Sequence, residues 1–250
     1  MNRYEETVRM WQSYAIKNAS DLDRYLENFE IIFAYHSGKI ENQDITYYDT
    51  REIFQNGRVT GYTGDPRVLF EQQNQKICAE FIKQKFTVKE QLSIDFIKEV
   101  HSTLTSGTYD IKRYIDNGER PGQFKRHDYV TGIHEIGAGA DEVEPMLRDL
   151  LDEINGNDIG QTLRVGAYFH VRFEYIHPFA DGNGRTGRTL LNYFLITRNH
   201  PPLIIHEEDK HEYYAALEAY DTDEVIDPLY DFLVNQTIKT WDKTFSRVKT

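Results

Sequence analysis

The chain has 250 residues and a hydrophobic content of 39%, enough for a sizeable core in one or two domains. Its 29 lysines and arginines face 41 acidic residues, and a net charge of −12 excludes a surface that attracts nucleic acid or anionic membrane throughout. The single cysteine, Cys78, excludes an internal disulfide, and no apolar run is long enough for a membrane span or a signal peptide. These features favour the cytoplasm.

The N-terminal region predicts two helices. Residues 2–19 form the first, and the second opens at Ser20 and Asp21, which offer a helix cap. Apolar residues then recur with a helical period at Leu22, Leu26, Phe29 and Phe33.

The second helix ends in a polar run from Ser37 to Asn42. Ser37 and Glu41 lie four residues apart, which places them on one face of a helix. Taken alone, a serine and a glutamate at this spacing are typical of a solvated helix face.

Residues 46–106 predict further packing helices, separated by a turn-rich connector from 57 to 64. His101 falls on a helix face, and the histidines lack ligand spacing such as His-Glu-x-x-His, so no zinc site is predicted. The apolar positions that mark the two main helices are Phe70, Ile77 and Phe81, then Leu92, Phe96 and Val100.

Residues 118–140 change character because they are rich in glycine and include the β-prone stretch from Tyr129 to Thr131. This composition predicts a short β-hairpin. A helix resumes from Glu142 to Ile154.

The most informative segment runs from His177 to Arg188 and combines a histidine, a carboxylate, three glycines and two arginines. Glycines allow successive N–H groups to converge on one anion, and guanidinium groups match phosphate oxygens. A carboxylate beside phosphates suits Mg²⁺, and a histidine can accept a proton near neutral pH. The mixture predicts a magnesium–nucleotide site with a general base.

The flanking pattern predicts a helix on each side of this segment. Pro178 cannot continue the first helix, so His177 marks its end, and the glycine-rich part opens the second at an anion-binding N-terminus. The first helix is marked by Val165, Phe169, Phe173 and Ile176, and the second by Leu190, Leu191, Phe194 and Leu195.

Two other interpretations fit part of the segment. Gly182, Gly184 and Gly187 match the dinucleotide fingerprint, but that fingerprint follows a strand, whereas a helix is predicted here. A plain helix–loop–helix connection explains the glycines and His177, but not Asp181 together with two arginines.

The C-terminal part predicts one helix from Glu207 to Tyr220, carrying Tyr213 and Tyr214, and a closing helix from Leu229 to Val248.

The segment from His177 to Arg188 resembles the full signature of the Fic family, and Ser37 to Asn42 resembles the family's inhibitory pattern. The resemblance implies a mostly α fold, a Fic-type helical bundle in one domain over residues 1–250. Its inhibitory helix would cover about residues 20–43 and its catalytic core about residues 90–235. A short β-hairpin, the flap, would lie over the nucleotide and carry Val130, Thr131, Gly132 and Ile133.

The same resemblance implies a protein adenylyltransferase that moves AMP from ATP to a Ser, Thr or Tyr hydroxyl of a target protein, and of itself. His177 would take the hydroxyl proton, Asp181 would hold Mg²⁺, and Phe179 would anchor the loop. Tyr213 and Tyr214 would lie near the adenine or ribose, although aromatic core packing explains them equally well. The remaining nucleotide-binding residues would be Gly182, Asn183, Gly184, Arg185, Thr186, Gly187 and Arg188.

The inhibitory pattern implies that Glu41 pairs with Arg188, the guanidinium otherwise available to the γ-phosphate, so ATP would bind with misplaced phosphates. Ser37 would orient the glutamate, and Asn42 completes the pattern.

Two alternatives stay open: removal of AMP with Glu41 orienting a water, and a regulatory nucleotide-binding module with little turnover. The expected partner is a hydroxyl-bearing protein, with neither nucleic acid nor membrane. The oligomeric state stays open, a homo-oligomer included.

Overall fold

The computed structural model describes residues 2–129, 137–155 and 161–248, and these residues contain helices but no strand. The mostly helical prediction is confirmed. The predicted flap residues Val130, Thr131, Gly132 and Ile133 lie outside the described residues, and the described segments on either side of them are turns and bends. The helices are α1 (Arg3–Ser13), α2 (Ala19–Glu41), α3 (Tyr47–Asn56), α4 (Pro66–Thr87), α5 (Ile94–Thr105), a π-helical turn (Lys112–Asp116), α6 (Val143–Asn155), α7 (Thr162–Ile176), α8 (Asn183–Thr197), a 3₁₀ turn (Glu207–Asp209), α9 (Lys210–Asp223) and α10 (Asp227–Val248).

Polar caps set several helix boundaries. The predicted helix over residues 2–19 ends early at Ser13, and α2 is capped by Asn18, not by Ser20 or Asp21. The Asn18 side chain accepts a hydrogen bond from the Asp21 amide at 3.1 Å, which satisfies one free donor of the first turn. Asp65 caps α4 in the same way, with Pro66 in its first turn.

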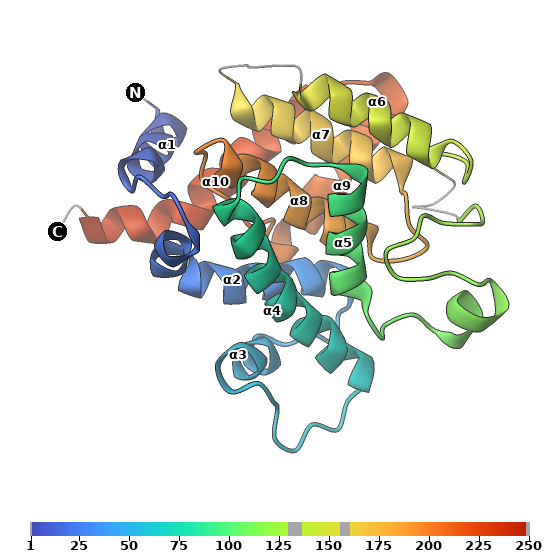
Figure 1. Ribbon diagram of the computed structural model, residues 1–250. Helices are drawn as coiled ribbons and strands as arrows, with labels where there is room; N and C mark the ends of the chain where they lie inside the picture. Colours follow the sequence, from blue (N-terminus) through green and yellow to red (C-terminus); the bar gives the residue numbers. More distant parts are fainter. Residues whose placement is uncertain (1, 130–136, 156–160, 249–250) are drawn as a thin grey trace.

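Helix α8 lies at the centre of the bundle, where α2, α4, α5 and α7 pack against it (Figure 1). Helix α7 approaches α8 closely at Gly166, because a side chain there would meet Leu191 at 3.1 Å. Phe169 and Phe173 on α7 are fully buried, as their spacing predicted. The core continues to the two ends of the chain, where Trp11 of α1 contacts Trp241 of α10 with ring centroids 5.4 Å apart.

Helix α4 departs from the predicted pattern. Phe70 and Ile77, predicted to face the core, are 54% and 48% exposed. The inward face of α4 is instead largely polar, because it meets the end of α2 and the loop before α8. Its buried polar residues are Glu71, Gln72, Asn74, Gln75 and Lys83.

The C-terminal end of α2 lies close to α4 because of Gly38. A side chain at Gly38 would meet Gln72 at 2.6 Å and Ile45 at 2.8 Å. This close approach brings Ser37 and Glu41 to Arg188 of α8, and it brings the cap residue Asn42 to Glu71 of α4. No helix in the described part of the chain is both long and apolar enough to cross a bilayer.

Candidate functional site at the start of helix α8

The loop between α7 and α8 is fixed by its own backbone. His177 ends α7 in the left-handed conformation, with φ of 49°, and its N–H donates to the Phe173 carbonyl at 3.0 Å. Gly182 opens α8 with φ of 79°, where a side chain would also strike Thr105 at 2.5 Å. The Asn183 side chain accepts from the Phe179 N–H at 2.9 Å and donates to its carbonyl at 2.7 Å. Asn183 therefore holds the loop with its side chain, which leaves its backbone N–H for a ligand.

Helix α8 begins without a side-chain cap. Its N-cap is Gly182, which has no side chain that could accept from the first N–H groups. The Thr186 hydroxyl donates to the Gly182 carbonyl at 2.8 Å, so it caps none of these N–H groups either. The first N–H groups of a helix carry partial positive charge and need acceptors. An uncapped start flanked by two buried arginines, Arg185 and Arg188, is an anion-binding geometry.

Arg188 is held by the last turn of α2. Its Nη2 donates to Glu41 Oε1 at 2.8 Å and to the Ser37 carbonyl at 2.8 Å, while its Nε donates to the Ser37 hydroxyl at 3.0 Å. The side chain of Arg188 is 2% exposed and that of Glu41 36%. Burial opposes the charge of Arg188, but Glu41 raises the Arg188 pKa above its ordinary value.

The predicted role of Ser37 was wrong in its detail. Its hydroxyl contacts Arg188, not Glu41, so Ser37 positions the guanidinium and not the carboxylate. This arrangement follows from the helix geometry, because the Ser37 hydroxyl and carbonyl both face Arg188 in the last turn of α2.

Two glycines of α8 make room for carboxylates. A side chain at Gly184 would lie 2.3 Å from Glu41 Oε1, and one at Gly187 would lie 2.4 Å from Glu174 Oε1. Real Cβ atoms do not approach other atoms so closely, so a side chain at either position would displace the carboxylate beside it. Gly184 permits the Glu41–Arg188 pair, and Gly187 permits the burial of Glu174.

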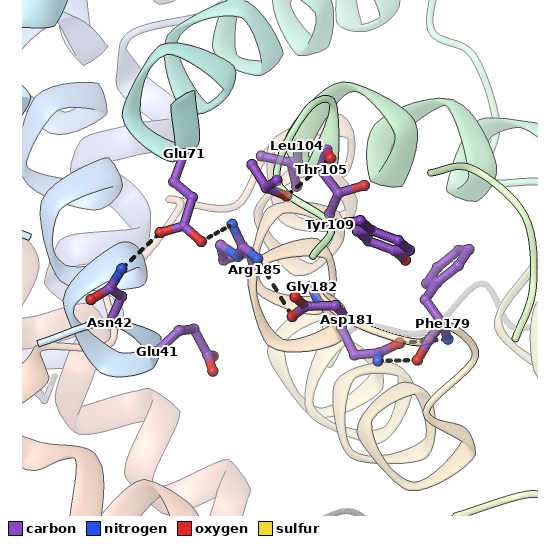
Figure 2. A network of polar contacts seen from close by, with 12 residues as sticks. Glu41, Asn42, Glu71, Leu104, Thr105, Tyr109, Phe179, Asp181, Gly182 and Arg185 are labelled. Carbon is purple, nitrogen blue, oxygen red and sulfur yellow. Dashed lines mark hydrogen bonds and ion pairs between the residues drawn. The ribbon is translucent and has the colours of Figure 1, made fainter. Parts of the chain in front are cut away.

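Asp181, the carboxylate of the loop, is surrounded by cations. Arg67 Nη2 of α4 lies 2.9 Å from Asp181 Oδ2, and Arg185 Nη2 lies 3.7 Å from Oδ1. Burial would raise the pKa of Asp181, but Arg185, Arg67 and Arg113 together hold it below its ordinary value, so the carboxylate is ionised. Glu71, also from α4, lies between Arg185 and the end of α2 (Figure 2).

Sequence reasoning missed Arg67 and Glu71 because α4 was assigned to packing alone. The available signal was the run of polar residues on the face of α4 opposite Phe70 and Ile77. His101, predicted to lie on a helix face, lies on α5 and is fully buried there. Its signal was its spacing from the buried residues Ile97 and Leu104 on α5.

The His101 side chain of α5 packs against the loop before α8. Its ring stacks on Phe179 with centroids 3.6 Å apart, which confirms Phe179 as a buried anchor. The Gly122 N–H donates to His101 Nδ1 at 2.8 Å, so Nε2 carries the proton and donates to the Asp181 carbonyl at 2.9 Å. Burial lowers the pKa of His101 to about 3, which keeps this neutral tautomer.

His177 is also neutral near pH 7. Burial and then the charge of Lys125 lower its pKa to about 4, although a hydrogen bond with the Glu174 backbone opposes this shift. Lys125 lies against the loop, because its backbone N–H donates to the Pro178 carbonyl at 2.9 Å. A neutral imidazole can accept a proton, as a general base must.

The two tyrosines of α9 differ in their surroundings. Tyr213 is buried, and its hydroxyl lies 2.8 Å from His170 Nε2, so core packing explains it. Tyr214 is 44% exposed, and the charges of Glu41 and Arg188 act on it. Of the pair, Tyr214 is the residue that can contact a ligand.

The fold is mostly helical, and the loop after α7 leads into an uncapped helix start that is flanked by two buried arginines. A model of the Fic/DOC family matches residues 91–195. "Protein adenylyltransferase Fic" of Drosophila persimilis is 27% identical over 213 residues, and "Protein adenylyltransferase fic-1" of Caenorhabditis elegans is 27% identical over 217. These matches cover 83% and 82% of this chain and 39% of each relative, so the chain spans about two fifths of their length.

Solved structures share the fold. The crystal structure of a Fic domain containing signaling protein from Bacteroides thetaiotaomicron has a TM-score of 0.81 and 25% identity, over 96% of this chain and 94% of that one. A fragment of C. elegans Fic-1 has a TM-score of 0.75 and 21% identity, over 98% of this chain and 73% of that one. These similarities identify a Fic/DOC domain over residues 91–195 of this chain.

Proposed function

We propose that this protein transfers AMP from ATP to a Ser, Thr or Tyr hydroxyl of a target protein and of itself, and that Glu41 inhibits the transfer. The observation that carries the proposal is the pair between Glu41 and the buried Arg188, formed at the uncapped start of α8 and beside the loop that begins at His177. The names of the curated relatives, protein adenylyltransferases, support the reaction class.

Each group of the loop has a role in this reaction. The backbone N–H groups at the start of α8 and the Arg185 guanidinium bind phosphate oxygens. The Arg185 Nε is buried and makes no hydrogen bond to any described residue, so it retains donor capacity for a phosphate. His177 accepts the proton of the attacking hydroxyl in its neutral form. Catalysis then rests on positioning and electrostatic stabilisation.

Asp181 suits a divalent cation. Its carboxylate is ionised, 21% exposed and the only acidic side chain of the loop, and Mg²⁺ prefers one or two protein carboxylates together with phosphates and water. Bound there, Mg²⁺ would neutralise phosphate charge. The described residues hold no group of three or more acidic, histidine or cysteine side chains around one point, as a dedicated protein-only site would require.

Inhibition follows from competition for one cation. Arg188 cannot give its best geometry to Glu41 and to a γ-phosphate together, and a phosphate offers more charge and more oxygens than a carboxylate. Without Glu41, Arg188 keeps both bonds to Ser37, so its fork stays oriented while its remaining donors face the nucleotide. Loss of Glu41 should therefore activate the protein without unfolding it.

A second candidate is removal of AMP from a modified protein. Glu41 is 36% exposed although it pairs with Arg188, so its carboxylate can also reach a water molecule at the site. In that reaction Glu41 would be required, whereas in AMP transfer it is inhibitory.

Autolabelling with α-labelled ATP separates these functions. We expect stronger labelling in Glu41→Gly than in wild type, and almost none in Glu41→Gly/His177→Ala or Glu41→Gly/Arg188→Ala. A folded Glu41→Gly protein that labels no better than wild type would refute inhibition by Glu41. Loss of AMP release from a pre-labelled protein in Glu41→Gly would instead support AMP removal. A protein that binds ATP but shows neither reaction would be a regulatory nucleotide-binding module.

A further inference from the structure

The carboxylate of Asp181 is already occupied by a cation of the protein. Arg67 Nη2 donates to Asp181 Oδ2 at 2.9 Å. The other oxygen, Oδ1, accepts the Gly182 N–H at 2.7 Å and lies 3.7 Å from Arg185 Nη2. A divalent ion that binds Asp181 must therefore take an oxygen from a guanidinium and must also approach its positive charge.

Glu71 connects this contact to the end of α2. Its side chain is 4% exposed, and its Oε1 accepts from Arg67 Nε at 3.0 Å and lies 3.3 Å from Arg185 Nη1. Its Oε2 accepts from Asn42 Nδ2 at 3.1 Å. Asn42 is the C-cap of α2 and follows Glu41 directly. A continuous chain of contacts thus runs from Asn42 through Glu71 and Arg67 to Asp181. Figure 2 shows Asn42, Glu71 and Asp181 of this chain, with Arg185 between the last two.

We propose that Arg67 is a positioning residue that competes with the divalent cation for Asp181, and that Glu71 and Asn42 couple this competition to the end of α2. The inference rests on the proposed function, because it assumes a metal–nucleotide complex at Asp181. The two residues that end α2 would then control both sides of the site: Glu41 holds Arg188, and Asn42 acts on Asp181 through Glu71.

The coupling has a simple stereochemical basis. While Asn42 binds Glu71 Oε2, Arg67 and Arg185 share the other oxygen, Oε1. Arg67 therefore uses only its Nε for Glu71, and its Nη2 donates to Asp181. When the end of α2 withdraws, Oε2 becomes available, and the planar fork of Arg67 can bind both oxygens of Glu71. Arg67 is 34% exposed, so it has space to move. Metal binding must in turn weaken the docking of α2, because such coupling is reciprocal.

Arg113 offers a matched control. It also lowers the pKa of Asp181, yet its guanidinium binds the Ala180 carbonyl at 3.2 Å and the Asp110 carboxylate, not the Asp181 carboxylate. Arg113→Gln therefore removes the same charge near the metal position without removing the contact. A direct competitor and a general electrostatic effect can be told apart in this way.

The test measures Mn²⁺ binding to the full chain by electron paramagnetic resonance, with a non-hydrolysable ATP analogue at saturation. Arg67→Gln should bind Mn²⁺ about tenfold more tightly than wild type, and Arg113→Gln should gain less than about threefold. Arg67→Lys, which keeps the charge, should stay close to wild type. Calorimetry without metal should show no comparable gain in affinity for the analogue.

A double-mutant cycle tests the coupling. Asn42→Ala should tighten Mn²⁺ binding about threefold in wild type and have no further effect in Arg67→Gln.

Equal Mn²⁺ affinity in wild type and Arg67→Gln, or an equal gain in Arg67→Gln and Arg113→Gln, would overturn the role of Arg67. Additive effects of Asn42→Ala would overturn the coupling. If Asp181→Ala weakens Mn²⁺ binding in each case, the metal assignment survives these failures, whereas unchanged binding in Asp181→Ala would overturn both.

Discussion

His101→Ala should lower both the stability of the protein and its activity, because one side chain supports the whole loop before α8. The substitution removes the ring that stacks on Phe179 and the partners of two polar backbone groups, the Gly122 N–H and the Asp181 carbonyl. The His101 side chain is fully buried, and both of its hydrogen bonds are at least partly buried. The loop would keep its Asn183 clamp and its packing against Thr105, but it would lose its hydrogen bond to α5.

The expected loss of stability can be estimated from these contacts. A buried polar group without a partner costs about 1–3 kcal/mol, and the small cavity left by the ring adds about 1 kcal/mol more. Two such groups and the cavity together give about 3–7 kcal/mol, which corresponds to a fall in melting temperature of roughly 10–20 °C for a chain of this size. His101→Phe should recover part of the stacking but neither hydrogen bond, so its melting temperature should lie between those of wild type and His101→Ala.

The assay combines thermal unfolding with autolabelling in the Glu41→Gly background, at a temperature where every variant is folded. His200→Ala is the matched control, since His200 is a buried histidine with contacts to the Tyr4 hydroxyl and the Pro201 carbonyl at the other end of α8. It should reduce stability without reducing labelling. If His101→Ala labels as well as His200→Ala does, the loop does not depend on His101 and the reasoning is refuted.

Two further predictions concern ionisable groups of the site. His177→Ala should abolish autolabelling while calorimetry still detects ATP binding, because the neutral imidazole contributes no charge to the phosphates; near wild-type labelling would exclude the general-base role. Burial, only partly offset by Arg188, raises the pKa of Glu174 from 4.5 to about 8. Between pH 4.5 and about 8, the folded protein therefore keeps a proton on Glu174 that the unfolded chain has lost. The free energy of unfolding falls as pH rises through this range. Glu174→Gln should raise the melting temperature at pH 8 and leave it nearly unchanged at pH 4; equal effects at both would contradict the assignment.

The sequence by itself determined the local part of this protein. Pro178 and Gly182 required a break between two helices, and the apolar spacing of Phe169, Phe173 and Phe194 placed both helices in the core. These signals are local because helix periodicity and backbone restrictions act over a few residues. The anion-binding character of the loop followed from the same short segment.

Resemblance, and not spacing, predicted the pair between Glu41 and Arg188, which are 147 residues apart. Nothing local in the sequence indicated that the Ser37 hydroxyl would contact the arginine, since both positions depend on how closely Gly38 lets α2 approach α4.

Only the tertiary structure decided which residues support the loop. Arg67 and Asp181 are 114 residues apart, and His101 and the Asp181 carbonyl are 80 apart. The face of α4 that carries Glu71 is polar because it meets polar and charged groups of α2 and α8. The spacing of apolar residues in the sequence could therefore not predict that this face is buried. A buried charge is tolerated only where folding supplies its partner, and that partner is defined by packing in three dimensions and not by neighbours in the chain.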